Sequence, residues 1–199
     1  MKKVVFSLFS IIAFQSFLFA QVVPGEKAKE FNLKNVDGKM VGISGSTDVK
    51  GAIVVFTCNH CPFSKMYESR IIKLHEKYAK LGYPVYAINS NDKNKEPDDS
   101  FENMVKLATD KKYPFPYLYD ESQEIAKAYG ATNTPHVFVL KKNANGYNVE
   151  YIGAIDDNAQ DESGAKDKFV EKAVDELLAG KAVTTKKVKA IGCTIKWKS

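Results

Sequence analysis

The sequence has little arginine, histidine, tryptophan or cysteine. Its 199 residues contain one arginine (Arg70), three histidines, one tryptophan and three cysteines. Because arginine is the usual side chain for bidentate contacts with phosphates and bases, this composition argues against nucleic-acid binding. The sequence shows no internal repeat or low-complexity segment, and its length suits one well-buried domain.

The first twenty residues have the pattern of an export signal. Two lysines precede an almost wholly apolar run over residues 4–19, and Ala20 offers a small residue before a cut. Leu18 is larger than the residue usual three positions before a cut, so an uncleaved membrane anchor is the alternative. We predict a signal peptide over residues 1–20, a periplasmic or otherwise exported location, and one domain over residues 21–199. Removing the two lysines lowers the formal charge from +5 to +3, which is only mildly basic.

Two cysteines lie close together directly after the apolar run 52–56. Cys58 and Cys61 enclose Asn59 and His60, and Pro62 follows. Two thiols at this spacing can close a disulfide, and a helix N-terminus stabilises a thiolate. We predict that Cys58 lies at the start of a helix with a lowered pKa, and that Cys61 lies one turn further in and is more shielded. Cys58 would then attack a substrate disulfide and Cys61 would resolve the mixed disulfide.

The residues between and after the cysteines are candidates for tuning this pair. His60, as a cation or as a donor toward the Cys58 sulfur, would stabilise the thiolate and make the disulfide more oxidising. The alternative is that His60 faces solvent and tunes nothing. Asn59 and Pro62 complete the predicted environment, with Pro62 in the first helical turn.

A structural zinc site uses the same cysteine spacing but normally needs two further ligands in a second pair. None is found, because Cys193 is single and His75 and His136 are isolated. We therefore predict no metal and no cofactor.

The remaining patterns predict an α/β fold. Asp37-Gly38 favours an N-terminal hairpin, and the continuous apolar strand 52–57 indicates a central position covered on both faces. Asn145-Gly146 favours an antiparallel hairpin near the end of the sheet. The other predicted elements are helices over 62–81, 101–108, 121–129 and 169–178, strands over 84–89, 115–119, 136–140 and 147–155, a loop over 90–100, and a basic tail over 181–199 with β-like spacing.

The order of these features resembles the thioredoxin superfamily. More narrowly, residues 24–198 are similar to a peroxiredoxin-like branch of the redoxin family, which includes alkyl hydroperoxide reductase and thiol-specific antioxidant. The resemblance implies a thioredoxin-like three-layer α/β fold with a central mixed sheet, an N-terminal β-hairpin and a C-terminal extension. The motifs that carry it are Phe31-Asn32-Leu33 with Asp37-Gly38, residues 56–62, residues 87–92, Tyr129-Gly130-Ala131 with Thr134-Pro135-His136, residues 155–158, and residues 192–197.

The same resemblance implies roles for several residues. The bond before Pro135 is expected to be cis, with Pro135 packed against the dithiol, whereas the residues alone favour a trans turn proline. The backbone of Thr134 is expected to pair with a bound substrate chain, and the nucleophilic and resolving roles fall on Cys58 and Cys61. This chain departs from the pattern at Thr57, where an aromatic is usual, and at Ala52, where thioredoxin has a buried acid.

Three functions follow from these patterns. The first is an exported thiol:disulfide oxidoreductase acting on protein or small-molecule disulfides or dithiols together with a redox partner protein. The second is a thiol peroxidase, although Val55 and Gly51 replace the threonine and proline expected before a peroxidatic cysteine, and no arginine follows Arg70. The third is a copper(I)-binding protein that uses the two cysteines and a histidine such as His136.

Cys193 is the odd cysteine. It can be a buried free thiol, an intermolecular partner, or an accessory thiol that takes part in exchange. The recurring motif around it hints at a role without naming one.

Overall fold

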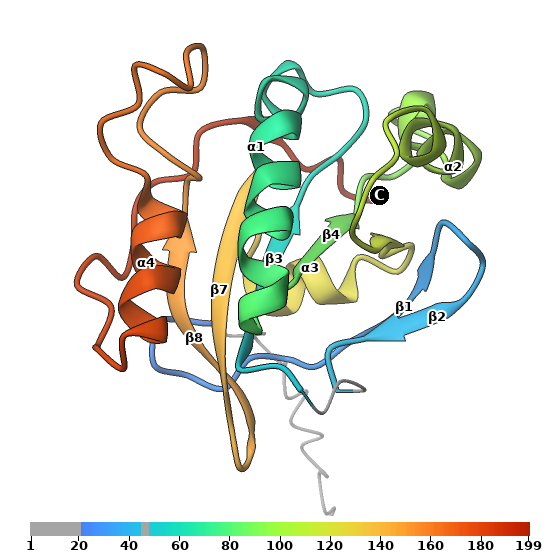
Figure 1. The fold of residues 1–199 in the computed structure, drawn as a ribbon. Coiled ribbons are helices and arrows are strands. Elements are labelled where there is room, and N and C mark those ends of the chain that lie inside the picture. Colours follow the sequence, from blue (N-terminus) through green and yellow to red (C-terminus); the bar gives the residue numbers. More distant parts are fainter. Residues whose placement is uncertain (1–20, 45–47) are drawn as a thin grey trace, which may run out of the picture.

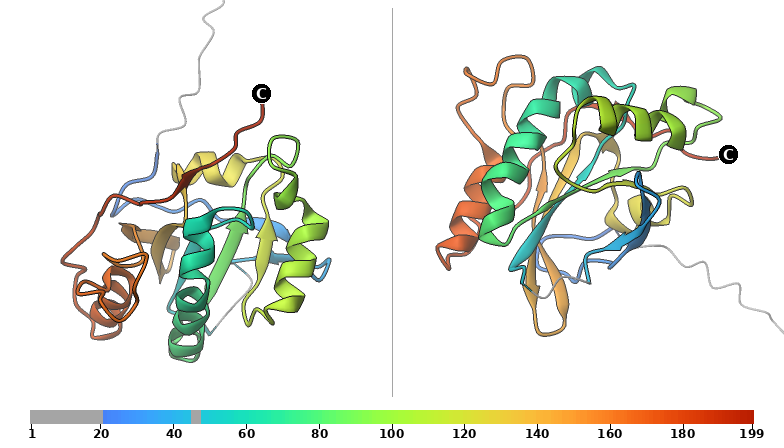
Figure 2. Two further views of the ribbon diagram at one scale, coloured as in Figure 1. Left: turned by 90° about the horizontal axis from the view of Figure 1, so that it is seen from above. Right: turned by 45° about the vertical axis from the view of Figure 1, so that its right-hand side comes forward.

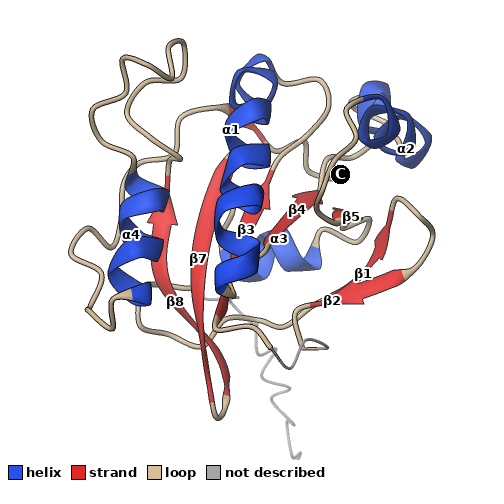
Figure 3. Cartoon of the chain, in the orientation of Figure 1, coloured by secondary structure: helices blue, strands red, loops and turns tan. Residues whose placement is uncertain are grey.

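The computed structural model describes residues 21–44 and 48–199, so the predicted signal peptide lies outside the described residues. The chain forms one seven-stranded mixed sheet in the order β2-β1-β5-β4-β3-β7-β8 (Figures 1 and 3). The strands are β1 (Asn32–Asn35), β2 (Met40–Gly42), β3 (Gly51–Phe56), β4 (Val85–Asn89), β5 (Tyr117–Tyr119), β7 (His136–Asn143) and β8 (Gly146–Gly153). The helices are α1 (Pro62–Tyr78), α2 (Phe101–Asp110), α3 (Glu124–Tyr129) and α4 (Phe169–Leu178).

The sheet combines parallel and antiparallel pairs. Strands β3, β4 and β5 are parallel, whereas β7 pairs antiparallel with both β3 and β8. The N-terminal hairpin β1–β2 forms as predicted and joins the sheet through β5. Every residue of β3 is buried, which explains its continuous apolar sequence, because both faces of a central strand are covered.

Two cores cover the two faces of the sheet. One core packs α1, α2 and α4 against residues such as Ile53 and Val55 of β3. The other packs α3 and the N-terminal segment against the alternate residues Val54 and Phe56. The view from above shows α3 across the sheet from α1 (Figure 2). The predicted three-layer thioredoxin-like architecture is therefore confirmed.

The C-terminal tail crosses the carboxyl end of the central strands, beside the start of α1 (Figures 1 and 2). There the short strand β9 (Cys193–Thr194) pairs antiparallel with β6 (Asn133–Thr134) to form a separate two-stranded sheet. Ile195 is 4% exposed and belongs to the core on the α3 face. The tail is thus part of the folded domain.

Some boundaries differ from the predicted ones. The predicted helix 62–81 is α1 followed by a short 3-10 turn (Ala79–Leu81), and Gly82 ends it with a φ of 95°. The predicted loop 90–100 contains a second 3-10 turn, Pro97–Asp99. Within the described ranges, no helix combines the length and the apolar composition needed to cross a membrane.

Candidate active site

The dithiol lies in the connection from β3 to α1. Helix α1 begins at Pro62, and Cys61 is its N-cap residue with an extended backbone. The prediction that Cys58 starts the helix and Cys61 lies one turn inside is therefore wrong. Asn59 and His60 form a bend that places Cys58 before the helix and Cys61 against its free N–H groups. Both thiols are buried, with Cys58 4% exposed and Cys61 0%.

Thr134 joins the two cysteines to the rest of the site. Its hydroxyl Oγ1 lies 3.2 Å from the Cys58 sulfur, and its carbonyl oxygen accepts a hydrogen bond from the Cys61 thiol at 3.2 Å. The Thr134–Pro135 peptide bond is cis, as the resemblance implies. Thr134, 73 or more positions away in the sequence, thus contacts Cys58 through its side chain and Cys61 through its backbone.

The two thiols influence each other's ionisation. Hydrogen bonding with Cys58 lowers the pKa of Cys61 to about 4. Hydrogen bonding with Cys61, together with burial and the nearby Asp99 charge, raises the pKa of Cys58. The predicted lowering of the Cys58 pKa is therefore not what the geometry gives: the pair loses its first proton easily, from Cys61, and holds the second strongly.

A buried carboxylate that sequence reasoning missed lies beside the dithiol. Asp99 is 0% exposed, and its two oxygens accept four hydrogen bonds. The donors are the Asn59 backbone N–H at 2.6 Å, His60 Nδ1 at 2.6 Å, Asn89 Nδ2 at 3.2 Å and Asn91 Nδ2 at 2.7 Å. Hydrogen bonds of this kind favour the charged form of a buried carboxylate and offset its desolvation.

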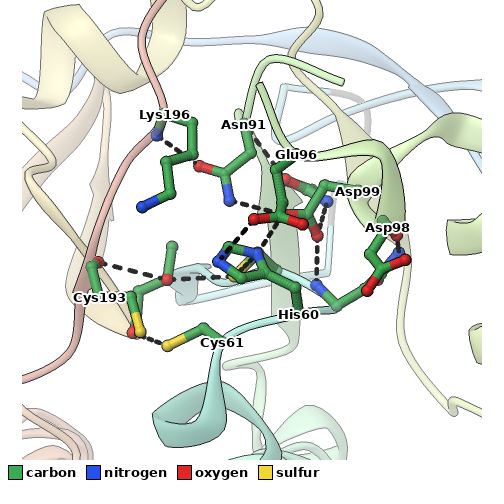
Figure 4. Close-up of polar contacts among 12 residues, drawn as sticks. His60, Cys61, Asn91, Glu96, Asp98, Asp99, Cys193 and Lys196 are labelled. Atoms are coloured by element: carbon green, nitrogen blue, oxygen red, sulfur yellow. Dashed lines mark hydrogen bonds and ion pairs between the residues drawn. The ribbon is translucent and has the colours of Figure 1, made fainter. Parts of the chain in front are cut away.

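His60 faces two acids as well as the sulfur. Its Nδ1 lies 3.6 Å from the Cys58 sulfur but only 2.6 Å from an Asp99 oxygen, and its Nε2 lies 3.5 Å from Glu96. Because Nδ1 carries at most one proton, the short contact assigns that proton to Asp99 rather than to the sulfur. Figure 4 shows His60 between the acidic residues and the cysteines. His60 does not face open solvent, so the alternative of a free surface histidine is wrong.

Asn59 fixes the bend between the cysteines. Its side chain donates to the Asp98 carbonyl oxygen at 2.8 Å and accepts from the Tyr117 hydroxyl at 2.8 Å. Pro62 occupies the first helical position, where a missing N–H costs no hydrogen bond. Asn59 and Pro62 therefore shape the loop. Neither has an ionisable side chain that could share a proton with a sulfur.

Cys193 lies next to the dithiol. Strand β9 brings it opposite Thr134, whose Oγ1 is 3.4 Å from the Cys193 carbonyl oxygen. Burial, followed by hydrogen bonding with Cys61, raises the pKa of Cys193 to about 11. The labelled side chains of Cys61 and Cys193 approach each other in Figure 4. The backbone edge of Thr134 that the resemblance assigned to a substrate chain is thus occupied by the protein's own tail.

The polar residues at the end of β4 hold the tail in place. Asn91 Oδ1 accepts from the Lys196 N–H at 2.8 Å, and the Asp92 N–H donates to the Lys196 carbonyl at 2.9 Å. Gln123 Nε2 donates to the Lys196 carbonyl at 2.8 Å. Gly192 passes so close to the Thr134 carbonyl oxygen that a Cβ would collide with it. These contacts join residues 87–92 to residues 192–197, two stretches that carry the resemblance.

One group of ligating side chains is found in the described ranges. It comprises Cys58, His60 and Asp99, whose ligand atoms all lie within 4.8 Å of one another. His136, which the copper alternative required, is not in this group; its Nδ1 instead accepts from the Thr132 N–H at 3.3 Å. The Asp99 oxygens already accept four hydrogen bonds, so the arrangement is that of a hydrogen-bonded carboxylate.

A small cavity of about 20 Å³ borders Cys58. It holds room for about one water-sized molecule. Its lining includes Ser64, Tyr113 and Tyr117. Arg70, the single arginine, does not line it and is paired with Asp156 at 2.6 Å.

The sequence pointed to some residues of this site and not to others. Residues 87–92 are one of the motifs that carry the resemblance, so Asn89 and Asn91 were noted, but no role was predicted for them. Asp99 lies 41 positions after Cys58 in a polar segment, where Asp98 and Ser100 looked equally suitable as polar loop residues. Only the folded chain shows which of the neighbouring acids turns inward.

This fold and site define a thioredoxin-like protein with a paired thiol. A family model for the AhpC/TSA family matches residues 24–150, and the chain belongs to that family. No curated protein matches the sequence.

Solved structures show the same fold. The chain is similar to a conserved protein from Geobacillus kaustophilus, with 40% identity, 88% of this chain and 92% of that chain covered, and a TM-score of 0.80. It is similar to a protein from Sinorhizobium meliloti with 34% identity, 90% and 97% coverage, and a TM-score of 0.80. Peroxidoxin BcpB from Mycobacterium tuberculosis shares the fold at 15% identity, 80% and 96% coverage, and a TM-score of 0.58.

Proposed function

We propose that this protein is an exported thiol:disulfide oxidoreductase that uses Cys58 as nucleophile and Cys61 as resolving thiol. The observation that supports it best is the contact of both sulfurs with Thr134, 3.2 Å in each case, beside a hydrogen-bonded carboxylate. Membership of a family of redox proteins agrees with it. The apolar run over residues 4–19 supports export, and the substrates are disulfides or dithiols.

Because Cys58 and Cys61 together hold one proton strongly, the pair can react in two ordered steps. When that proton lies on Cys61, the thiol donates to the Thr134 carbonyl, and the Cys58 thiolate accepts from the Thr134 hydroxyl. Cys58 then attacks one sulfur of the substrate disulfide, forming a mixed disulfide and releasing the first substrate thiolate. That thiolate leaves with the proton from Cys61.

The second step closes the protein disulfide. The Cys61 thiolate, stabilised by the backbone N–H of Ser64 in the first turn of α1, attacks the Cys58 sulfur and releases the second substrate thiolate. The protein loses two electrons and the substrate disulfide gains them. The reverse sequence oxidises a dithiol, and the reduction potential of the pair decides which direction prevails.

Reduction of insulin by the protein, with a dithiol reductant regenerating it, tests this proposal. We expect Cys58→Ser and Cys61→Ser each to abolish catalytic insulin reduction, since each removes one of the two exchanging sulfurs. Ser122→Ala, an exposed hydroxyl outside the site, is the control and should retain the activity. Full activity in Cys58→Ser would contradict the proposal.

Thiol peroxidase activity is a second candidate, favoured by the cavity of about 20 Å³ beside Cys58, which admits only a very small molecule. Against it, the pairing of Arg70 with Asp156 leaves this cavity without the arginine that would polarise a peroxide. Measuring hydrogen peroxide consumption by the reduced protein separates the two. We expect consumption much slower than insulin reduction, and the opposite order would make the peroxidase the better assignment.

A further inference from the structure

Three thiols meet at Thr134. Its hydroxyl contacts the Cys58 sulfur, its carbonyl oxygen accepts from Cys61, and its backbone pairs with Cys193. Direct cross-strand neighbours have Cβ atoms about 4.5 to 5.5 Å apart, so strand pairing alone brings Cys193 to the residue that both other cysteines touch.

The sulfurs of Cys61 and Cys193 share the start of α1. The backbone N–H of Phe63 faces the Cys193 thiol and lowers its pKa, and the N–H of Ser64 does the same for Cys61. The two thiols also lie close enough to influence each other's pKa, and their side chains approach each other in Figure 4. Cys61 therefore lies beside both Cys58 and Cys193, all three meeting at Thr134, which is the arrangement that a disulfide needs in order to move from one partner to the other.

The tail is built to hold Cys193 at this place. The Asn133 side chain donates to the Gly192 carbonyl at 3.0 Å, and the Ile195 N–H donates to the Thr132 carbonyl at 3.0 Å. Ile195, two residues after the cysteine, is buried in the core. Anchors before and after Cys193 distinguish it from a cysteine on a loose tail.

The three thiols also differ in exposure. Cys58 and Cys61 are buried, whereas Cys193 is partly exposed. A protein or small thiol outside the domain reaches Cys193 more easily than either member of the pair, and access is one of the factors that set the rate of thiol exchange.

We propose that Cys193 is a third redox thiol, which attacks the Cys61 sulfur of the oxidised pair and forms a Cys61–Cys193 disulfide. The bond between Cys58 and Cys61 breaks, Cys58 leaves as a thiolate, and it takes up the proton that the Cys193 thiol gives up. No electrons enter or leave the protein, so the step needs no added oxidant or reductant. It returns Cys58 to its reduced form and moves the disulfide toward the surface. This inference rests on the proposed Cys58–Cys61 disulfide.

Mapping of the disulfides by trypsin digestion tests this step. Cleavage at lysines places Cys58 and Cys61 together on peptide 51–65 and Cys193 on peptide 190–196. The pair therefore gives a disulfide within one peptide, and the exchanged form gives a cross-link between two. The protein is oxidised with oxidised glutathione, quenched with acid, alkylated with N-ethylmaleimide and digested.

We expect the oxidised wild type to contain the cross-linked peptides, with Cys58 alkylated in that fraction and fragmentation placing the bond on Cys61. In Cys58→Ser the cross-link should become the main oxidised product, because the competing partner is gone. A wild type that carries only the disulfide within peptide 51–65, with Cys193 alkylated throughout, would overturn the inference.

The variant Cys193→Ser separates this inference from the proposed function. It retains Cys58 and Cys61, so it should form the disulfide within peptide 51–65. Failure of that disulfide to form in Cys193→Ser would refute the proposed function itself. Its formation there, together with the absence of a cross-link in the wild type, would refute only the role of Cys193.

Discussion

Asp99 and Asp156 are two buried carboxylates that differ in their basic partner, which is a histidine for Asp99 and an arginine for Asp156. Asp156 is 5% exposed and binds Arg70 at 2.6 Å, and it accepts from the Tyr67 hydroxyl at 2.9 Å. Arg70 stays charged and donates onward to the Asn158 carbonyl at 2.6 Å. No atom of this cluster touches a cysteine in the contacts described, so it ties the segment after β8 to α1.

The Asp99 cluster has the same chemistry of hydrogen bonding but a different neighbour. Its partner is His60, and the Nδ1 atom of that ring lies 3.6 Å from the Cys58 sulfur. Asp99 thus connects to the Cys58 sulfur through one side chain, His60, whereas Asp156 connects to no cysteine in the contacts described. Substitutions at the two acids should therefore separate stability from reactivity.

The largest effect on stability is expected for Asp156→Asn. Removing the charge leaves Arg70 buried without its ion-pair partner, and breaking such a pair costs about 3 kcal/mol of unfolding free energy. The alkylation rate of Cys58 should stay within twofold of wild type. Urea denaturation and alkylation kinetics measure the two effects. Asp167→Asn, which removes an exposed acid, is the control, and a stability loss equal in both variants would show that the buried pair is unimportant.

His136 extends the comparison to a buried imidazole whose charged neighbour is a lysine. Burial, with a smaller effect of Lys187, lowers the pKa of His136 to about 4. The unfolded chain binds this proton below about pH 6.5, and the folded chain does not until about pH 4. Stability from His136 is therefore complete above pH 6.5 and falls as the pH drops toward 4, by about 3 kcal/mol.

The measurement is urea denaturation between pH 7 and 4 for wild type and His136→Asn. The variant keeps a hydrogen-bond acceptor for the Thr132 N–H but cannot be protonated, so its stability should fall less steeply. His75→Asn serves as the control for a histidine that is only half-buried. Equal slopes in wild type and His136→Asn would contradict the assignment.

Asp99→Asn should cost less stability than Asp156→Asn but should change the dithiol. In the amide, one carboxylate oxygen is replaced by an NH₂ group that faces other hydrogen-bond donors. This lowers the free energy of unfolding by about 2 kcal/mol. Because the Asp99 charge raises the pKa of Cys58, its removal should lower that pKa and increase the alkylation rate of Cys58 several-fold.

Asp98→Asn is the matched control, since Asp98 is the next residue in the chain and is exposed. Iodoacetamide kinetics at neutral pH, with the modified cysteine identified by mass spectrometry, read out the change. An unchanged rate in Asp99→Asn would place Asp99 with Asp156 as a purely structural acid.

The smallest effect is expected for His60→Asn. Since the Nδ1 proton faces Asp99, loss of the imidazole should change the Cys58 alkylation rate by only about twofold. A tenfold decrease in the same iodoacetamide assay would show instead that His60 donates directly to the sulfur.

The fold was predicted correctly where a structural element depends on residues that are neighbours in the sequence. The apolar run at β3, the turn at Asp37-Gly38 and the hairpin at Asn145-Gly146 each appear where the sequence placed them. Helix α1 begins at Pro62 as predicted, but Cys58 was wrongly placed at its start, because a helix boundary depends on which carbonyl first accepts a hydrogen bond. Here that carbonyl belongs to Cys61, which accepts from the Lys65 N–H at 3.0 Å.

The site was only partly predictable for a related reason. Cys58 and Cys61 are close in sequence, so their spacing alone indicates thiol–disulfide chemistry. Asp99 and Cys193 reach the same place through tertiary contacts, and no periodicity or spacing links them to the dithiol. The recurring motif around Cys193 marked the residue, but its pairing with Thr134 required the folded chain.

The central claim is that Cys58 and Cys61 form one reversible redox couple. Equilibration of the protein with glutathione buffers of increasing oxidised fraction, followed by alkylation and mapping of peptide 51–65, tests it most directly. In Cys193→Ser, where exchange with a third thiol cannot occur, we expect a single two-electron transition in which Cys58 and Cys61 become protected together. Adding Cys61→Ser should abolish this transition. Alkylation of both Cys58 and Cys61 across the whole range of buffers would contradict it.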